Sequence, residues 1–202
     1  MTVLDRLIPA AQLMEINAAD VPAPPSIVWD RIRHGELAQA PLVRALFALR
    51  NLFMRDSSGA SPTIRIDDLR SSPERPGFQM LVNDPPREFA VGAIGQVWRL
   101  DIPFVHVATA NDYARFGQPG YVKVAWAVRV VPGETNDRCR VEIDVRVHAT
   151  DEPSWRKFQR YFWLVGPFSR YIRRSFLKAL VRDAARPDGR PAAPAHHPAG
   201  GR

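Results

Sequence analysis

The stretch that decides the fold covers residues 138–180 and reads RCRVEIDVRVHATDEPSWRKFQRYFWLVGPFSRYIRRSFLKAL. In its first part, apolar residues alternate with polar ones: Val141, Ile143, Val145 and Val147. A period of two predicts a strand with one dry face. After Thr150 and Asp151, which can cap a helix, the apolar residues recur at steps of three and four. The stretch therefore predicts a strand over 138–150 and then a long amphipathic helix over about 153–186.

The predicted helix has one apolar and one basic side. Its apolar stripe consists of Trp155, Phe158, Phe162, Val165, Ile172, Phe176 and Ala179. The basic residues lie mostly on the other side: Arg156, Arg160, Arg170, Arg174, Lys178 and Arg182. Gly166-Pro167 interrupts the middle. Because a proline removes one helical hydrogen bond and clashes with the preceding turn, we expect a kink there.

Upstream of this stretch the pattern predicts mostly short strands. The predicted strands are 13–18, a pair of alternating residues at Ile64 and Ile66, 77–82, two strands within 87–103 with glycines at the bend, and 121–131. Residues 104–120 show no regular period. Two short helices are expected after the first strand, one starting at Ser26, behind a run of prolines, and one over 40–53.

This order of elements predicts an α+β fold. The expected architecture is a curved antiparallel sheet of about six to seven strands wrapped around the long C-terminal helix, because that arrangement buries the dry face of each element. We expect residues 1–186 to form a single domain. Residues 187–202 are rich in Pro, Ala and Gly and lack large apolar side chains, so we expect a disordered tail.

The composition excludes several classes of protein. The chain has 202 residues, of which 46% are apolar and 24% charged, as in soluble globular proteins. Its one cysteine, Cys139, excludes an internal disulfide framework and a cysteine-rich zinc site. The sequence shows neither an apolar run of about 20 residues, as a membrane span needs, nor the pattern of a secretory signal. We therefore expect a cytoplasmic protein without a metal or a nucleotide cofactor.

The net charge of +7 is concentrated in the last quarter of the chain. Residues 1–153 hold 17 basic and 19 acidic residues, whereas residues 154–202 hold 11 basic and 2 acidic ones. Such asymmetry indicates an anionic partner or, alternatively, a solvated helix face and a tail. We expect no nucleic-acid binding, because the sequence contains no motif that reads bases and no stacking platform. Transient contact with an anionic membrane surface stays open, and the sequence leaves the oligomeric state undetermined.

Three segments carry a resemblance to a known superfamily. They are PAPPSIVWDRI (22–32), EFAVGAIGQVWR (88–99), and VRVHATD (145–151) with the helix that follows it. Together they resemble the START-like (SRPBCC) superfamily of helix-grip proteins, which includes polyketide cyclases and lipid-transfer domains, and within it an uncharacterised bacterial branch. The matching residues are Glu88, Gly92, Gly95 and Trp98, and Pro167, Phe168, Ser169, Ile172, Arg173 and Arg174. Asp144 stands where that branch often has a glutamate.

The resemblance implies an internal cavity between the long helix and the sheet. Such sites are mostly apolar, with a few polar groups that orient the ligand. The aromatic residues expected to line it are Trp98, Phe104, Tyr121, Trp126, Tyr161, Phe162 and Phe168. The alternative is that each of them only fills the core. We therefore expect a carrier or sensor that binds a small hydrophobic or amphipathic molecule such as a lipid, a polyketide or an aromatic compound.

Two alternatives to a binding protein remain open. The first is a cyclase or dehydratase acting in the same cavity, for which Arg99, Asp101, His106 and Asp144 are the ionisable groups to check. The second is a module that docks an anionic partner through the basic C-terminal helix. We assign no catalytic residue, because the charged set Glu142, Asp144, Arg146 and His148 alternates with the dry face of its strand. That set is expected on the wet face of the sheet, as cross-strand ion pairs.

Overall fold

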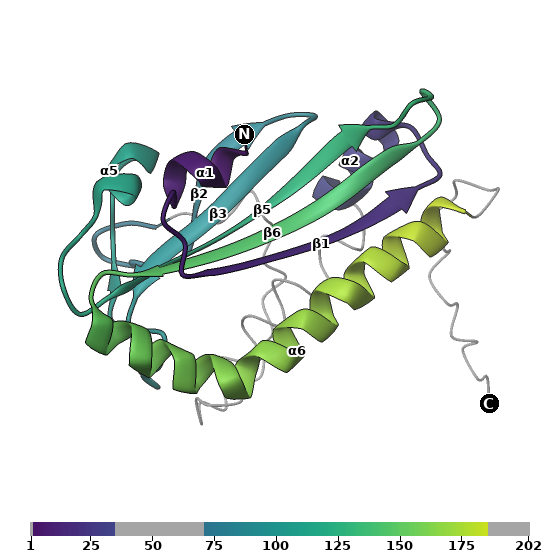
Figure 1. Cartoon of the computed structure of the whole chain (residues 1–202). Coiled ribbons are helices and arrows are strands. Elements are labelled where there is room, and N and C mark those ends of the chain that lie inside the picture. The colour runs from purple at the N-terminus through teal and green to yellow at the C-terminus, as the bar shows by residue number, and fades with distance from the viewer. Residues whose placement is uncertain (1, 35–70, 186–202) are drawn as a thin grey trace, which may run out of the picture.

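A six-stranded antiparallel sheet and one long helix form most of the computed structural model, which describes residues 2–34 and 71–185 (Figure 1). The elements, in chain order, are α1 (Val3–Leu7), β1 (Leu13–Val21), α2 (Pro25–His34), β2 (Gln79–Asp84), β3 (Glu88–Gly95), β4 (Phe104–Val105), α5 (Ala110–Arg115), β5 (Val122–Pro132), β6 (Cys139–Ala149) and α6 (Glu152–Ala184). The predicted α+β class and the long C-terminal helix are confirmed.

The strands are arranged in the order β1-β6-β5-β3-β2, and the short β4 pairs with β3. Each pairing is antiparallel, and β5 and β6 form the central hairpin, in which Val128 lies opposite Ile143. Both strands match the ranges predicted from their period of two, because alternation over eleven residues leaves one register that buries every apolar side chain.

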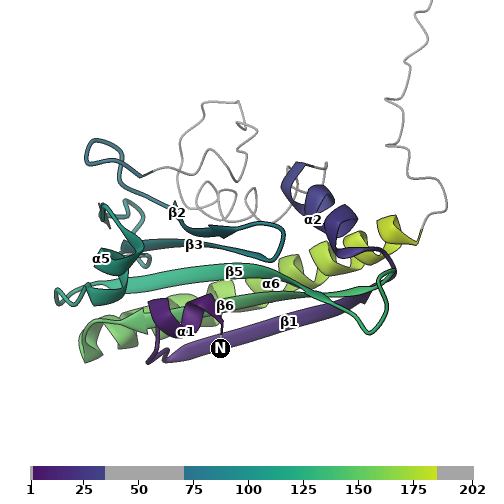
Figure 2. The same cartoon turned by 90° about the horizontal axis from the view of Figure 1, so that it is seen from above.

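The two faces of the sheet are covered by different helices (Figures 1 and 2). We call the face toward α6 the inner face and the face toward α1 and α5 the outer face. On the inner face, Val141 and Ile143 pack with Phe176 and Leu180 of α6. On the outer face, Ala125 and other small residues pack with α1 and α5. The outer positions of β6 are therefore only partly in contact with water: Arg140 is exposed, Glu142 and His148 are half-buried, and Asp144 and Arg146 are buried.

Helix α6 spans 33 residues and bends in its middle, with the convex side away from the sheet (Figure 1). Asp151 caps its first turn by accepting a hydrogen bond of 2.7 Å from the backbone N–H of Ser154. Pro167 lies inside the helix, in its middle part, and the hydrogen bond that a proline removes favours such a bend. In the ranges that the structure covers, none of the helices has the length and apolar content that crossing a membrane requires.

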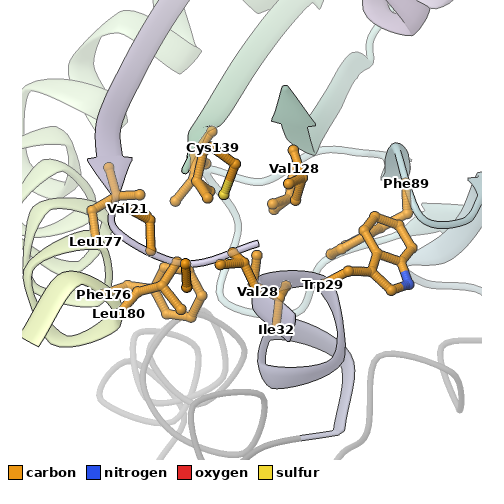
Figure 3. Packing of buried hydrophobic residues seen from close by; sticks show 14 of the residues in the cluster. Val21, Val28, Trp29, Ile32, Phe89, Val128, Cys139, Phe176, Leu177 and Leu180 are labelled. Atoms are coloured by element: carbon orange, nitrogen blue, oxygen red, sulfur yellow. The ribbon is translucent and has the colours of Figure 1, made fainter. Parts of the chain in front are cut away.

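The main core cluster joins α2, α6 and the sheet (Figure 3). Val28 and Ile32 of α2 lie between the helix residues Phe176 and Leu180 and the sheet. Fully burying a side chain of this size contributes about 1.5–3 kcal/mol to the free energy of unfolding. Burial of this cluster therefore holds α2 and the C-terminal half of α6 against the same end of the sheet.

Several predicted elements differ from the observed ones. Helices α1 and α5 were not predicted, because helices of five and six residues show no recognisable period. Residues 88–95 form one strand, β3, where the sequence predicted the first of two strands with a glycine bend. The helix expected over 40–53, the strand expected near Ile64 and the tail 187–202 lie outside the described residues.

The two glycines of β3 make room for aromatic side chains and do not form a bend. A Cβ atom on Gly92 would lie 2.5 Å from Cδ1 of Leu81 and 3.1 Å from the ring of Tyr113 on the outer face. A Cβ atom on Gly95 would lie 2.9 Å from the ring of Phe104. A side chain at either position would therefore displace its neighbours, Leu81 and Tyr113 at Gly92 and Phe104 at Gly95, and a glycine in a strand interior often marks such a close approach.

The substitution Gly92→Ala tests this packing. We expect it to lower the free energy of unfolding by about 1–3 kcal/mol, because the added methyl group overpacks a site closed by the buried Tyr113 ring. The matched control is Gly77→Ala, where no atom lies within 4 Å of the added Cβ. Urea unfolding of both variants measures the difference, and equal stabilities would contradict the explanation.

The single thiol gives a second test. Cys139 is 2% exposed within the core cluster, and burial raises its pKa. Both effects keep the thiol protonated and inaccessible, although Arg138 and Arg140 flank it in sequence. We expect a maleimide reagent to label Cys139 only after unfolding, so the labelling rate in native buffer should follow global unfolding. Rapid labelling of the native protein would show that this end of the core opens locally.

Candidate functional site

The inner face of the sheet carries one row of side chains that runs across five strands. The backbone register places Glu15 of β1 beside Val145, Val145 beside Trp126, Trp126 beside Val91, and Val91 beside Met80. Residues in register on neighbouring strands point to the same face. The row therefore leads from a charged residue at one edge, through the indole of Trp126 at the centre, to an apolar edge.

Trp126 is the central aromatic residue of this row. It is 4% exposed, and its ring packs edge-on against Phe89 with centroids 5.6 Å apart. Its Nε1–H is buried, and no acceptor within the described part of the chain lies in hydrogen-bond reach. More than nine in ten buried donors have a partner, so this N–H is an exception among the described residues of the inner face.

A second aromatic group lies at the N-terminal half of α6. Phe158 and Phe162 stack with centroids 5.4 Å apart, and Tyr161 lies 6.2 Å from Phe158. Burial raises the pKa of the Tyr161 hydroxyl. This group packs against Val147, on the inner face, and against Trp98. Four of the seven aromatic residues expected around a cavity are therefore on the inner side, in two groups: Trp126, and Trp98 with Tyr161 and Phe162.

Of the other three expected residues, only Phe104 also lies on the inner side. It packs against Phe78 and covers Gly95 of β3. Tyr121 packs against Phe116 in the cluster of the outer face, so it does not line the inner side. Phe168 of α6 is 44% exposed. Neighbouring residues of one strand point to opposite faces of the sheet, and residues of one helix point to different sides according to their spacing. The expected aromatic residues therefore do not all face the same space.

A buried arginine ties α6 to the edge strand β1. Arg173 is 2% exposed and donates three sets of hydrogen bonds, to Asn17 Oδ1 at 2.8 Å, to Ser169 Oγ at 2.8 Å and to Glu15 Oε2. Arg170 also donates to Glu15, at 2.7 Å. This inner-face polar cluster (Glu15, Asn17, Ser169, Arg170 and Arg173) holds two guanidinium groups and one carboxylate, so it carries an excess of one positive charge.

Burial sets the electrostatics of this cluster. Desolvation lowers the pKa of the Arg173 guanidinium, and the Glu15 carboxylate beside it opposes that shift. The guanidinium stays charged, because an arginine does not lose its proton in a protein. Each of its three nitrogens donates to a partner on β1 or α6, which makes the contact both an ionic and a geometric link between the two elements.

Sequence reasoning missed this cluster, although one signal was present. Arg173 follows Ile172 on the buried side of α6, and a charged residue on a buried side needs a partner. Glu15 gave no such signal, because Glu15 and Asn17 alternate with the apolar Met14 and Ile16, which the structure leaves exposed. The sequence alone gives no register between β1 and α6, so it could not have paired them.

On the outer face the predicted ion pairs are present, and the face is exposed at Arg140 but covered at Asp144 and Arg146. Glu142 pairs with Arg129 across the strands as expected, and that guanidinium lowers the pKa of the carboxyl group. The expectation is wrong for Asp144 and Arg146, which are 7% and 6% exposed. Arg146 lies 3.0 Å from Asp144 and 2.7 Å from Asp5 of α1, so α1 covers this pair. None of these side chains reaches the inner face.

The four ionisable groups checked for catalysis have separate surroundings. Arg99 is exposed and bonds to Gln96, and Asp101 is exposed. His106 bonds to Ser71 Oγ at 3.0 Å, and Asp144 lies on the outer face with Arg146. General acid–base catalysis needs such groups within hydrogen-bond reach of one substrate. The arrangement therefore gives no support to a cyclase or dehydratase that uses these four residues.

The buried arginine can be tested against its neighbour on the same helix. We expect Arg173→Met to lower the free energy of unfolding by about 3 kcal/mol, because it leaves Asn17 and part of the Glu15 carboxylate without a donor. Arg174→Met removes an exposed guanidinium one residue away and should change stability by less than about 0.5 kcal/mol. Thermal and urea unfolding measure both. Equal losses would show that Arg173 does not anchor the helix.

Comparisons with known proteins give similarity of structure only. No family model matches the sequence, and no curated protein matches it. A point mutant of norcoclaurine synthase from Thalictrum flavum, solved with a transition-state analogue, is 15% identical, with 84% of this chain and 94% of that chain covered and a TM-score of 0.41. Protein XoxI from Bacillus cereus is 13% identical, with coverages of 85% and 94% and a TM-score of 0.35. A protein from Arthrobacter aurescens is 12% identical, with coverages of 92% and 94% and a TM-score of 0.38.

These structural neighbours are norcoclaurine synthase and bacterial proteins of the helix-grip fold, the fold expected from the sequence. The similarity carries no conclusion about what this chain binds. The fold is read from the chain's own elements, an antiparallel sheet of order β1-β6-β5-β3-β2 whose inner face is crossed by the 33-residue helix α6. On that basis the chain has the α+β helix-grip fold.

Proposed function

We propose that the protein binds one small amphipathic molecule between the inner face of the sheet and α6, as a carrier or sensor. The observation that carries the proposal is the buried Nε1–H of Trp126, which has no acceptor among the described residues. It lies at the centre of the inner face, among apolar side chains. A site with an apolar lining and one hydrogen-bond donor, the Trp126 N–H, is suited to a ligand with an apolar body and one acceptor oxygen.

The inner-face polar cluster adds a second polar feature to the same row. Glu15 and Trp126 lie two strands apart, about 10 Å at the usual strand spacing. The two guanidinium groups around Glu15 leave one positive charge in excess at that edge. A ligand with an anionic or strongly polar head and an apolar body complements this distribution. Lipid, polyketide and aromatic compounds with such a head are the classes proposed.

A carrier of apolar molecules collects and releases them at a surface that holds them. We therefore also propose transient contact with an anionic membrane surface, which the basic residues of α6 would favour. The four ionisable groups considered for a cyclase or dehydratase lie in separate surroundings, so we do not propose that activity.

The test uses anilinonaphthalene sulfonate, a fluorescent probe with apolar rings and an anionic head. We expect saturable binding with one probe per chain. Trp126→Phe should weaken binding about fivefold, because it removes the N–H donor and keeps an aromatic ring. Trp163→Phe is the matched control, since Trp163 is 83% exposed on the far side of α6. Circular dichroism confirms that both variants are folded.

Native mass spectrometry of the protein as purified gives an independent readout. A co-purifying small molecule at a ratio near one, identified after denaturing extraction, would support the proposal and name the ligand class. Absence of saturable probe binding, together with no thermal shift across a panel of lipids and polyketides, would contradict it.

A further inference from the structure

Four large apolar side chains of α6 are exposed within a short part of the helix. Trp163, Leu164, Phe168 and Tyr171 have exposed fractions of 83%, 61%, 44% and 68%. In the described part of the chain, eight large apolar side chains are this exposed, so half of them lie within residues 163–171. Single exposed apolar residues are ordinary, but a contiguous group indicates a surface that contacts something.

Three of these four side chains lie on the side of α6 that faces away from the sheet. Successive residues turn by about 100° around a helix, which places Trp163, Leu164 and Tyr171 roughly 90–170° from the centre of the buried side formed by Val165 and Ile172. Phe168, four residues before Ile172, lies at the flank of the buried side. The four residues lie on both sides of Pro167 in α6, a helix that bends with its convex side away from the sheet (Figure 1).

The same side of the helix is strongly basic. The sequence from Pro153 to Arg182 contains no acidic residue. Exposed basic side chains flank the apolar group toward both ends of the helix: Arg156, Lys157 and Arg160 before it, and Arg174, Lys178 and Arg182 after it. One of them, Arg156, pairs with Glu152 in the first turn. We call these basic residues and the four apolar ones the exposed stripe of α6.

We infer that the exposed stripe of α6 is the surface through which the protein docks on an anionic lipid bilayer. Tryptophan and tyrosine favour the interface between headgroups and acyl chains, and arginine and lysine are attracted by acidic headgroups. Reversible docking is stable when an apolar and an electrostatic signal act together. The inference rests on the proposed membrane contact and is independent of ligand binding between the sheet and α6.

The charge of the exposed stripe is unfavourable for binding a second copy of the chain. Two copies joined through this stripe would bring basic residues of both helices together, since the stripe holds no acidic residue between Pro153 and Arg182. Like charges in an interface are unfavourable. A bilayer containing phosphatidylserine supplies negative headgroups for the basic residues and an interface with the acyl chains for Trp163 and Tyr171.

The test measures co-sedimentation of the full-length protein with vesicles of phosphatidylcholine, with and without phosphatidylserine. We expect binding to the anionic vesicles that weakens with added salt. Trp163→Ser/Tyr171→Ser should weaken it at least about tenfold, and Arg160→Gln/Arg174→Gln about 20-fold. The matched controls are Met14→Ser/Ile16→Ser, an exposed apolar pair on β1, and Arg99→Gln/Arg138→Gln, an exposed basic pair. Both should bind within about twofold of the wild type.

The possible outcomes distinguish failure of the proposed membrane contact from failure of its assignment to α6. If the wild type does not bind anionic vesicles, the proposed membrane contact fails as well as the inference. If it binds but the stripe variants behave like the controls, only the assignment to α6 is overturned. If light scattering shows a dimer that Trp163→Ser/Tyr171→Ser dissociates, without vesicle binding, the stripe is a protein interface and the inference is wrong. Probe binding by the interior is unaffected in all three cases, so it is judged separately.

Discussion

The central hairpin of β5 and β6 is buried on both faces, and the rest of the structure is arranged to cover it. Ala125 and Ala127 point to the outer face, whereas Trp126 and Val128 point to the inner face, and all four are less than 5% exposed. An antiparallel sheet whose central strands carry buried apolar side chains on both faces needs a layer on each side. Helix α6 with α2 provides one layer, and the short helices α1 and α5 provide the other.

Each layer is fixed to the sheet by one buried arginine. On the inner face, Arg173 of α6 bonds to Glu15 and Asn17 of β1. On the outer face, Arg146 of β6 bonds to Asp144 beside it and to Asp5 of α1. A guanidinium group binds carboxylates with a fixed geometry, so these contacts set the position of each helix as well as adding to its attachment. Removing one partner of such a pair leaves a buried charge uncompensated, which makes the arrangement sensitive to single changes.

The two sides of α6 are suited to different tasks. Its buried side contributes Phe176, Leu180 and the Arg173 contacts, and it covers the inner face, where the Trp126 N–H has no acceptor among the described residues. Its exposed side combines aromatic and basic residues around Pro167, which removes one hydrogen bond of the helix. One helix thereby connects the proposed ligand site with the proposed membrane surface.

The sequence by itself determined the fold class, β5, β6 and α6, the cap at Asp151 and the bend at Pro167, because these depend on periodicity and on local hydrogen bonding. It also indicated the inner side for Trp98, Phe104, Trp126, Tyr161 and Phe162. Only the tertiary structure decided that Tyr121 belongs to the outer face, that Phe168 is exposed, and that Asp144 and Arg146 lie buried under α1. It alone paired Arg173 with Glu15, 158 positions apart in the chain. Periodicity tells which residues share a face of one element, but which element covers that face depends on contacts between distant segments, and no local pattern contains them.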